Sequence, residues 1–212
     1  MAVKNFKKNK YKIIKDAVPK DIATFVYNYF LLKRQVLTTF QSNKYISPFT
    51  QDWGTFEDPQ APNSYSHYSD VATETLLLFA QSFIEKETGL NLLPNYSYAR
   101  IYKDGDVLER HKDRFSCEVS CTLHLGGDTS WPIYLEPSGK RDKKGTAVIQ
   151  KPGDILIYMG GEMEHWREAY TGKDYCQAFL HYNNANTPQS ADNIYDSRPH
   201  LGLPANFKKA GR

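Results

Sequence analysis

The hydrophobic pattern of the chain changes at Gly89, and this change constrains the fold more than any other feature. Before Gly89, apolar residues recur at helical spacing in two segments. After it, they form short strand-like runs separated by glycine, proline and charged turns. These runs cover residues 96–102, 117–125, 131–135, 146–150, 154–159 and 175–182. Two helices followed by six or more strands predict an α+β domain whose sheets close around a core, for which the jelly roll is one solution.

The two helical segments are expected to pack rather than to catalyse. The first opens at Val18-Pro19-Lys20-Asp21, where proline suits a first helical turn. Ser69 or Asp70 can cap the second, and Gly89 can end it. Both segments carry an apolar stripe, made of Ile22, Phe25, Val26, Tyr29 and Phe30 in the first and of Leu76, Leu77, Phe79, Ala80, Phe83 and Ile84 in the second.

The remaining segments complete one domain spanning residues 1–212. We expect a basic arm over 1–10, a helical support over 11–90 that begins with a short strand at 11–15, the strands over 95–183, and a polar, proline-rich arm over 184–212. The support contains a long loop at 42–69 that is rich in aromatic residues, and such a loop is uncommon unless it is functional or disordered. Residues 140–145 predict an exposed, charged hairpin loop.

Charge and cysteine content exclude several classes of protein. The formal net charge is +3, from 27 basic and 24 acidic residues that are spread along the chain, which is too mild and too even for a nucleic-acid-binding groove. The three cysteines lie in strand-like runs with no paired framework, so we expect reduced thiols. No apolar segment approaches the length of a membrane span. These features predict a soluble, cytoplasmic protein without a membrane partner.

His111 and Asp113 are the first candidates for a metal site. In an extended segment, alternate side chains leave the same side of the backbone, so the two residues can bind one ion. A third ligand must come from elsewhere, and His165 follows after several more strand-like runs. Two imidazoles and one carboxylate on one face of a metal form the facial triad of non-haem Fe(II) oxygenases, which leaves the opposite face open. The alternatives are a solvated turn for the pair and a surface histidine for His165.

A longer set of residues resembles the Fe(II)/2-oxoglutarate-dependent dioxygenases, and among them the prolyl 4-hydroxylase group. The set comprises Tyr102, Gly105, Asp106, Leu108, His111, Asp113, Pro152-Gly153-Asp154, Leu156 and His165. Three further phrases, at 131–134, 165–168 and 179–182, are similar to small oxygenases of marine phage and bacterial genomes. The resemblance covers most of the chain. It implies a double-stranded β-helix (jelly-roll, cupin-like) core with N-terminal packing helices, and Fe(II) held by His111, Asp113 and His165.

The resemblance also implies 2-oxoglutarate and O₂ as cosubstrates, ascorbate as a further cofactor, and Tyr102 at the 2-oxoglutarate site. The family's basic residue for the far carboxylate lies on the strand after the distal histidine, but here Asp174 and Tyr175 occupy those positions. Arg100, which shares a strand face with Tyr102, is our first expectation for this role, with Lys173 and Arg167 as the other candidates.

Thr122 and His124 lie on the strand after His111 and Asp113, and we expect both to point inward. His124 then either lies beside the cosubstrate or is a hydrogen-bonded core histidine. The expected substrate contacts are Arg114, Glu136 and about two of four aromatic residues, which are Trp131, Tyr134, Tyr158 and Trp166. The alternative for the aromatic residues is that they fill the core.

The leading functional hypothesis is a 2-oxoglutarate-dependent hydroxylase of prolyl residues in a protein or peptide. A second hypothesis is an oxygenase of the same fold that acts on a free amino acid, a small metabolite or a nucleobase, although a nucleobase would favour a concentrated basic groove. A third is a metal- or sugar-binding jelly-roll module without turnover. Release of CO₂ and succinate from 2-oxoglutarate with Fe(II) distinguishes the enzymes from the module.

Overall fold

The computed structural model describes residues 2–138, 140 and 143–208 of the chain. Its helices are α1 (Ala2–Asn9), α2 (Lys20–Ser42) and α3 (Val71–Thr88), with short 3₁₀ turns η1 (Phe115–Cys117), η2 (Ile194–Ser197) and η3 (Ala205–Phe207). Its strands are β1 (Tyr11–Ile14), β2 (Tyr65–Tyr68), β3 (Leu92–Tyr102), β4 (Leu108–His111), β5 (Val119–Gly127), β6 (Ile133–Glu136), β7 (Thr146–Val148), β8 (Ile155–Met159), β9 (Glu164–Arg167) and β10 (Tyr175–Asn184).

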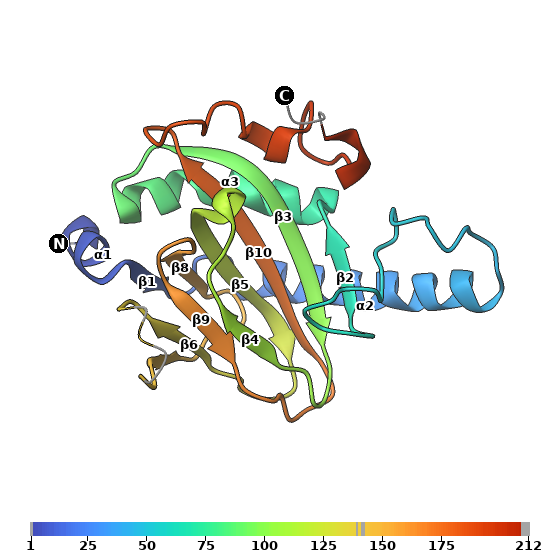
Figure 1. Ribbon diagram of the computed structural model, residues 1–212. Helices are drawn as coiled ribbons and strands as arrows, with labels where there is room; N and C mark the ends of the chain where they lie inside the picture. The colour runs from blue at the N-terminus through green and yellow to red at the C-terminus, as the bar shows by residue number, and fades with distance from the viewer. Residues whose placement is uncertain (1, 139, 141–142, 209–212) are drawn as a thin grey trace.

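The strands form two antiparallel sheets. The larger sheet has the order β1-β8-β5-β10-β3-β2, and the smaller has the order β4-β9-β6-β7. From β3 onward, successive strands pass from one sheet to the other, except that β6 and β7 pair within the smaller sheet, so the chain winds around a shared interior (Figure 1). The result is an α+β fold with a double-stranded β-helix core and packing helices, as the sequence predicts.

Helices α2 and α3 cover one face of the larger sheet (Figure 1). Asp70 caps α3 by accepting a hydrogen bond of 2.8 Å from the backbone N–H of Ala72, and Gly89 ends it in the left-handed conformation. The buried residues of α2 recur every three or four positions, which directs one stripe onto the sheet. This stripe comprises Ala23, Val26, Phe30, Lys33 and Leu37.

The central strands of the larger sheet are buried on both faces. One face packs against the helices, and the other faces the interior between the two sheets. On β10, Cys176, Ala178 and Leu180 belong to the apolar core under the helices. The alternate residues, Tyr175, Gln177, Phe179 and His181, therefore point into the interior between the sheets. This alternation places polar and aromatic side chains inside the β-helix.

Several elements differ from the expectations. The basic start forms helix α1, which contacts α3 and buries Phe6 in the helix-side core. Residues 65–68, expected in a loop, form β2 on the edge of the larger sheet. Strands β4 and β9 were not predicted, because most of their residues are charged or polar and form no apolar run. The expected hairpin loop at 140–145 connects β6 and β7, and its residues 141–142 lie outside the described part. In the described ranges, no helix is long and apolar enough to cross a membrane.

Candidate metal centre

Strands β4 and β9 bring the two candidate histidines together. His111 and His165 are direct partners in the antiparallel ladder, and Asp113 follows β4 with its backbone N–H bonded to the Gly160 carbonyl. The Nε2 atoms of both histidines lie 3.5 Å from Oδ1 of Asp113. One ligand atom from each residue lies within 4.8 Å of the other two. The three residues predicted from the sequence are thus brought together as a group that could hold one metal ion.

Backbone carbonyls orient both imidazoles toward that position. Nδ1 of His111 lies 2.7 Å from the Glu109 carbonyl, and Nδ1 of His165 lies 3.1 Å from the Met163 carbonyl. Each Nδ1 therefore donates its proton to a carbonyl, so that each Nε2 faces the metal position and would bind a metal once its own proton is displaced. This tautomer is the one that metal-binding histidines use.

The carboxylate of Asp113 is held in a similar way. Ser120 donates a hydrogen bond of 2.6 Å to Oδ2, which leaves Oδ1 to face the two Nε2 atoms. Gly160 passes so close to this carboxylate that a Cβ there would collide with it and with the Cys117 carbonyl. Only glycine therefore permits the approach of the two chain segments.

The electrostatics keep Asp113 ionised. Burial alone would raise the pKa of its carboxyl, but hydrogen bonds with His111 and His165 hold the pKa well below the usual range. Burial would lower the pKa of His111, and hydrogen bonds to Asp113 and to the Glu109 carbonyl raise it overall. A divalent cation would replace the protons that these groups share and would bind two neutral imidazoles and one carboxylate.

A cavity of about 430 Å³ opens beside the three ligand atoms. A second cavity of about 390 Å³ shares part of its wall, at Asp58, Pro59, Tyr96, Tyr98 and Arg114. Its far end is formed by Pro204, Ala205 and Lys208 of the C-terminal arm, by which we mean residues 185–208. We call the two cavities together the groove; the three candidate ligands line the first, and the 51–60 segment and the C-terminal arm line the second.

A second group of possible metal ligands shares Asp113 and adds Cys117 and His181. Burial raises the pKa of the Cys117 thiol to about 12, and its sulfur lies 3.0 Å from the Tyr96 hydroxyl. The Nδ1 atom of His181 is already 3.1 Å from the Ser120 hydroxyl. Because these two side chains are buried and engaged, His111, Asp113 and His165 form the better site.

Arg100 lies on the cavity wall but is already neutralised. Its Nε donates a hydrogen bond of 2.8 Å to Oδ2 of Asp58, and its Nη2 bonds the same oxygen at 2.5 Å. Its Nη1 donates to the Tyr102 hydroxyl at 2.8 Å. Asp58 comes from the long 42–69 loop, so the arginine holds part of that loop against β3. Sequence reasoning gave no sign of this partner.

The other candidates for the far carboxylate lie in contrasting environments. Lys173 is exposed in the turn before β10. Arg167 is 1% exposed and shares the inner face of β9 with His165. The imidazole of His124 stacks on Tyr175 with ring centroids 4.2 Å apart, while the Thr122 hydroxyl donates to Gln150 at 3.1 Å. Thr122 and His124 are buried on β5, and neither lines the cavity.

The expected substrate residues divide in the same way. Arg114 and Tyr158 line the cavity. Tyr134 and Trp166 do not, because they stack on each other at the half-buried face of the smaller sheet. Trp131 lies in an aromatic cluster with Tyr102, Tyr170 and Tyr175, and Glu136 accepts hydrogen bonds from the turn after β6. Within the described chain, these four residues are therefore placed away from the groove.

Several residues of the site had not been singled out from the sequence. Ser120, Phe179 and His181 reach the interior because they occupy alternate positions of β5 and β10. Tyr96 and Tyr98 do the same on β3. The signal that could have found them is the period of two, counted outward from Tyr102 and His124.

Comparison with known proteins gives a likeness of fold. No family model matches the chain, and no curated protein matches it. A prolyl-4-hydroxylase of Pseudomonas putida superposes with a TM-score of 0.56 at 14% identity, covering 87% of this chain and 98% of that one. A Trichoplax adhaerens prolyl hydroxylase, solved with a hypoxia inducible factor peptide, gives 0.58 at 16% identity, with 86% and 88% covered. HygX of Streptomyces hygroscopicus, solved with nickel and 2-oxoglutarate, gives 0.59 at 13% identity, with 99% and 94% covered.

In this chain, His111, Asp113 and His165 lie on the architecture that these structures share. The chain therefore has the fold of the Fe(II)/2-oxoglutarate oxygenases, a group of structures that includes prolyl hydroxylases.

Proposed function

We propose that this protein is an Fe(II)- and 2-oxoglutarate-dependent dioxygenase that hydroxylates prolyl residues in a protein or peptide and releases succinate and CO₂. One observation carries the proposal. Two oriented imidazoles and one ionised carboxylate converge at the wall of an open cavity, and this donor set suits Fe(II) with positions left for other ligands.

The residues present fit the metal and the cosubstrate. His111, Asp113 and His165 would hold the iron, and the interior of the β-helix beyond them would hold the 2-oxo acid. When bound, Fe(II) would allow O₂ to act as the oxidant, with one oxygen atom converting a C–H bond of the substrate to C–OH and the other entering succinate as 2-oxoglutarate loses CO₂. The protein contributes orientation of the ligands through the Glu109 and Met163 carbonyls and through Ser120. The buried aromatic residues of β3 and β10 keep water away from the reacting positions.

A peptide substrate is supported by the shape of the groove. The two adjoining cavities run from the candidate metal centre past Tyr96 and Tyr98 to the C-terminal arm. An extended chain could lie along this path and place one prolyl ring beside the metal. Arg114, on the wall of both cavities, offers donors to backbone carbonyls of such a chain.

A small-molecule substrate is the second candidate, and the size of the cavity favours it. About 430 Å³ lies within the range of sites for small ligands. HygX, with a similar fold, was also solved with hygromycin B bound. Hydroxylation of a free amino acid or small metabolite would need only the cavity beside the metal, without the second one.

The first test measures succinate and CO₂ release from 2-oxoglutarate with Fe(II) and O₂. We expect turnover in the wild type and none in His111→Ala, Asp113→Ala or His165→Ala, with circular dichroism unchanged because other residues pack the core. Mn(II) and Co(II) should bind without supporting turnover. Wild-type activity in any of the three variants, or equal turnover with zinc, would contradict the proposal.

The second test separates the two substrate classes. Peptides that contain proline are incubated beside matched peptides with alanine in its place, and mass spectrometry follows the gain of one oxygen atom. Oxygen gain only in the proline series supports the prolyl hydroxylase. Oxygen gain only in free amino acids or small metabolites supports the second candidate, and metal binding with no turnover of any kind supports a binding module.

A further inference from the structure

Arg167 is a buried cation without an anionic partner. It is 1% exposed, and its Nη1 donates a hydrogen bond of 2.5 Å to the Trp131 carbonyl. Its Nε and Nη2 atoms have no hydrogen-bond partner in the described chain. No carboxylate of the described residues forms an ion pair with it. A buried charge left in this state costs several kcal/mol, so the fold carries a group whose stabilisation must come from a bound anion.

The unpartnered edge of Arg167 has the shape of a carboxylate receptor. Nε–H and the Nη2–H next to it form the fork that binds the two oxygens of a carboxylate in parallel. The guanidinium carbon lies 4.7 Å from the Trp131 ring centroid and 5.1 Å from the Tyr175 ring centroid. The aromatic rings therefore hold the planar group in one orientation.

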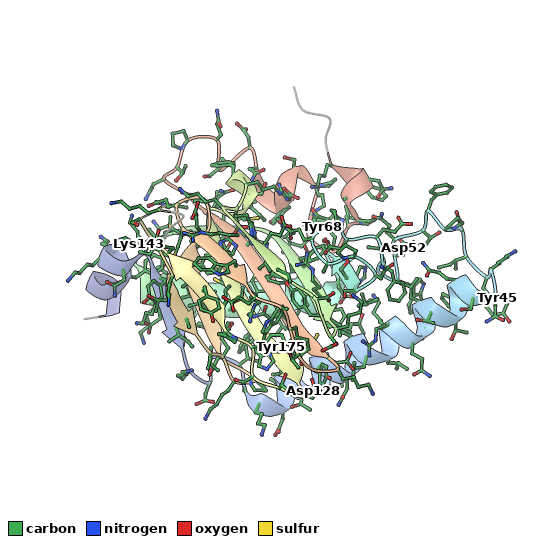
Figure 2. The ribbon with its side chains drawn as sticks, turned by 60° about the horizontal axis from the view of Figure 1, so that its bottom comes forward. Tyr45, Asp52, Tyr68, Asp128, Lys143 and Tyr175 are labelled. Carbon is green, nitrogen blue, oxygen red and sulfur yellow. The ribbon has the colours of Figure 1, made fainter. Side chains whose placement is uncertain are left out.

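Two other buried polar atoms near Arg167 also lack partners. They are the Tyr175 hydroxyl and Nδ1 of His124. Both residues are at most 4% exposed, and their ring centroids lie 4.2 Å apart. Tyr175 is the first residue of β10 and is labelled in Figure 2, next to Asp128. Burial and the nearby Arg167 lower the pKa of His124 to about 4, so the imidazole is neutral near pH 7. The Tyr175 hydroxyl can therefore act as a second donor to an anion that is bound by Arg167.

The distance from the metal position to Arg167 fits a short dicarboxylic acid. His165 and Arg167 are alternate residues of β9, so their Cα atoms lie about 7 Å apart on one face of the strand. Leu108, which pairs with Arg167 across the ladder, lines the cavity beside the metal. Arg167 itself is not among the residues that line this cavity, but its ladder partner is. A five-carbon 2-oxo acid whose keto end is at the metal spans a comparable length.

The other basic candidates are less suited to this role. Arg100 already directs two nitrogens at Asp58 and a third at Tyr102, so its charge is compensated within the protein. Lys173 is exposed in a turn. Arg167 is the one of the three whose geometry and charge balance both call for an incoming carboxylate.

We infer that Arg167 and the Tyr175 hydroxyl bind the far carboxylate of 2-oxoglutarate, with the His124 ring as the side wall of this pocket. The inference rests on the proposed function and deepens it, because it assigns the selectivity for a dicarboxylic 2-oxo acid. Arg167 lies two positions after His165 on β9 of the smaller sheet, and it takes the place of a basic residue on β10 of the larger sheet. On β10, Tyr175 contributes a hydroxyl instead.

The experiment measures binding rather than turnover. Full-length protein loaded with Mn(II) is titrated by calorimetry with 2-oxoglutarate and, separately, with pyruvate, which lacks the far carboxylate. In Arg167→Met we expect the Kd for 2-oxoglutarate to rise about tenfold or more, by the usual worth of a hydrogen bond to a charged group, while the Kd for pyruvate is unchanged. Tyr175→Phe, which keeps the ring and its stacking, should raise only the Kd for 2-oxoglutarate, by a smaller factor.

Two further variants serve as comparison. Lys173→Ala removes an exposed charge and should leave both Kd values unchanged. The double variant Asp58→Asn with Arg100→Gln removes the buried cation of the cavity wall together with its partner, so this pair leaves no unpaired charge, and the variant should keep the preference for 2-oxoglutarate over pyruvate. If Arg167→Met does not fold, Tyr175→Phe decides the matter through the same two titrations.

Each outcome of these titrations supports or contradicts one assignment of the far carboxylate. Unchanged 2-oxoglutarate binding in both Arg167→Met and Tyr175→Phe overturns the inference, and loss of the preference in the Asp58/Arg100 double variant alone assigns the carboxylate to Arg100 instead. Wild-type protein that binds Mn(II) but neither acid refutes the proposed function, and this outcome is distinct from loss of selectivity alone.

Discussion

Asp113 gives its two carboxylate oxygens different partners, and this division depends on Ser120. The hydroxyl donates to Oδ2 at 2.6 Å, and it also lies 3.0 Å from the Cys117 carbonyl and 3.1 Å from Nδ1 of His181. We expect Ser120→Ala to weaken Mn(II) binding about tenfold, because outer partners of metal ligands typically contribute this much. Calorimetric titration of the metal-free protein with Mn(II) measures the effect.

The control for Ser120→Ala is Thr129→Ala. This change removes a hydroxyl that donates to the Thr171 carbonyl in an exposed turn. Its Mn(II) affinity should equal that of the wild type. Equal affinities in all three proteins would show that Asp113 is oriented by the backbone alone.

At the level of single residues, the sequence predicts the parts of the site that depend on local spacing. His111 and Asp113 could be recognised because two positions along an extended segment always share a side. His165 could be added through the resemblance. The pairing of Arg100 with Asp58 could not be foreseen, since it joins β3 to a loop with no periodic pattern. The environment of Arg167 depends on Trp131, which precedes β6, and on Tyr175 of β10, and these two are far apart in the sequence.

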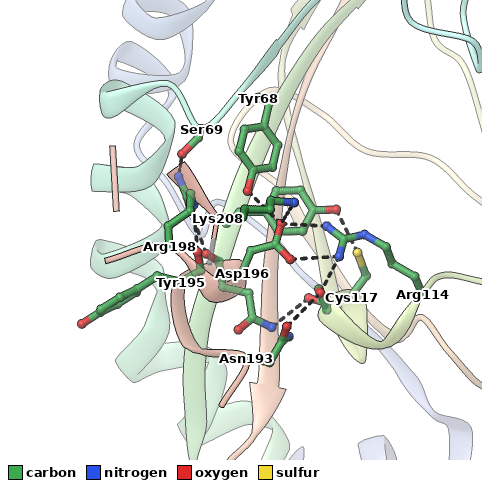
Figure 3. Close-up of polar contacts among 12 residues, drawn as sticks. Tyr68, Ser69, Arg114, Cys117, Asn193, Tyr195, Asp196, Arg198 and Lys208 are labelled. Atoms are coloured by element: carbon green, nitrogen blue, oxygen red, sulfur yellow. Dashed lines mark hydrogen bonds and ion pairs between the residues drawn. The ribbon is translucent and has the colours of Figure 1, made fainter. Parts of the chain in front are cut away.

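Among the elements, the C-terminal arm is attached to the helical layer through Arg198. This side chain is fully buried, donates to Glu74 of α3 at 2.8 Å and to the Asn95 carbonyl at 3.0 Å, and also bonds Ser69 (Figure 3). Arg198→Ala leaves the buried Glu74 carboxylate without its cation. We expect the free energy of unfolding to fall by about 3 to 5 kcal/mol, measured by urea denaturation.

A double variant tests the cause of that loss. Glu74→Gln with Arg198→Met removes both charges and keeps similar volumes, so most of the stability should return. If the double variant is as unstable as Arg198→Ala, side-chain packing rather than the Arg198–Glu74 ion pair attaches the arm.

A second attachment of the arm lies at the groove. Asp196 accepts two hydrogen bonds of 2.9 Å from Arg114, one of 2.7 Å from Tyr68, and pairs with Lys208 at 2.6 Å (Figure 3). Tyr195, Asp196 and Ser197 all have positive φ values, which non-glycine residues rarely adopt. These contacts hold the backbone in that conformation and fix the wall residue Arg114 in place.

The predictability of the elements follows their length and period. The two long helices and the caps of α3 agree with the sequence pattern, because many residues contribute to each. Strands β4 and β9 consist mostly of charged or polar residues, so they show no apolar run by which a strand could be recognised. Helix α1 was missed because its lysines indicate a solvated arm, whereas burial of Phe6 against the neighbouring elements stabilises it as a helix.

For the whole molecule, buried histidines set the response to mild acid. Burial lowers the pKa values of His124 and His181 to about 4, whereas in the unfolded chain they are about 6.5. As the pH falls below 6.5, these two histidines bind protons in the unfolded state but stay neutral in the folded state, so stability is lost. His111 has the opposite sign, because its raised pKa adds stability in the same range.

The expected loss for the metal-free protein is on the order of 2 kcal/mol for each of the two buried histidines between pH 7 and pH 5, offset in part by His111. Asp70, Asp113 and Asp196 have lowered pKa values, so their contributions are lost only as the pH falls below about 4. Urea denaturation at pH 7 and pH 5 measures the difference. His124→Asn should reduce the pH dependence, and a wild-type stability that is equal at the two pH values would contradict the assignment.

The two faces of β3 and β10 have a consequence for how such a protein can evolve. Side chains that hold the helices to the sheet and side chains that surround the reaction centre alternate along the same strands. A substitution at Phe179 or Tyr98 changes the interior without disturbing Ala178 or Ala99 beneath the helices. New substrates can therefore be acquired by single changes on one face, while the other face preserves the stability that such changes would otherwise erode.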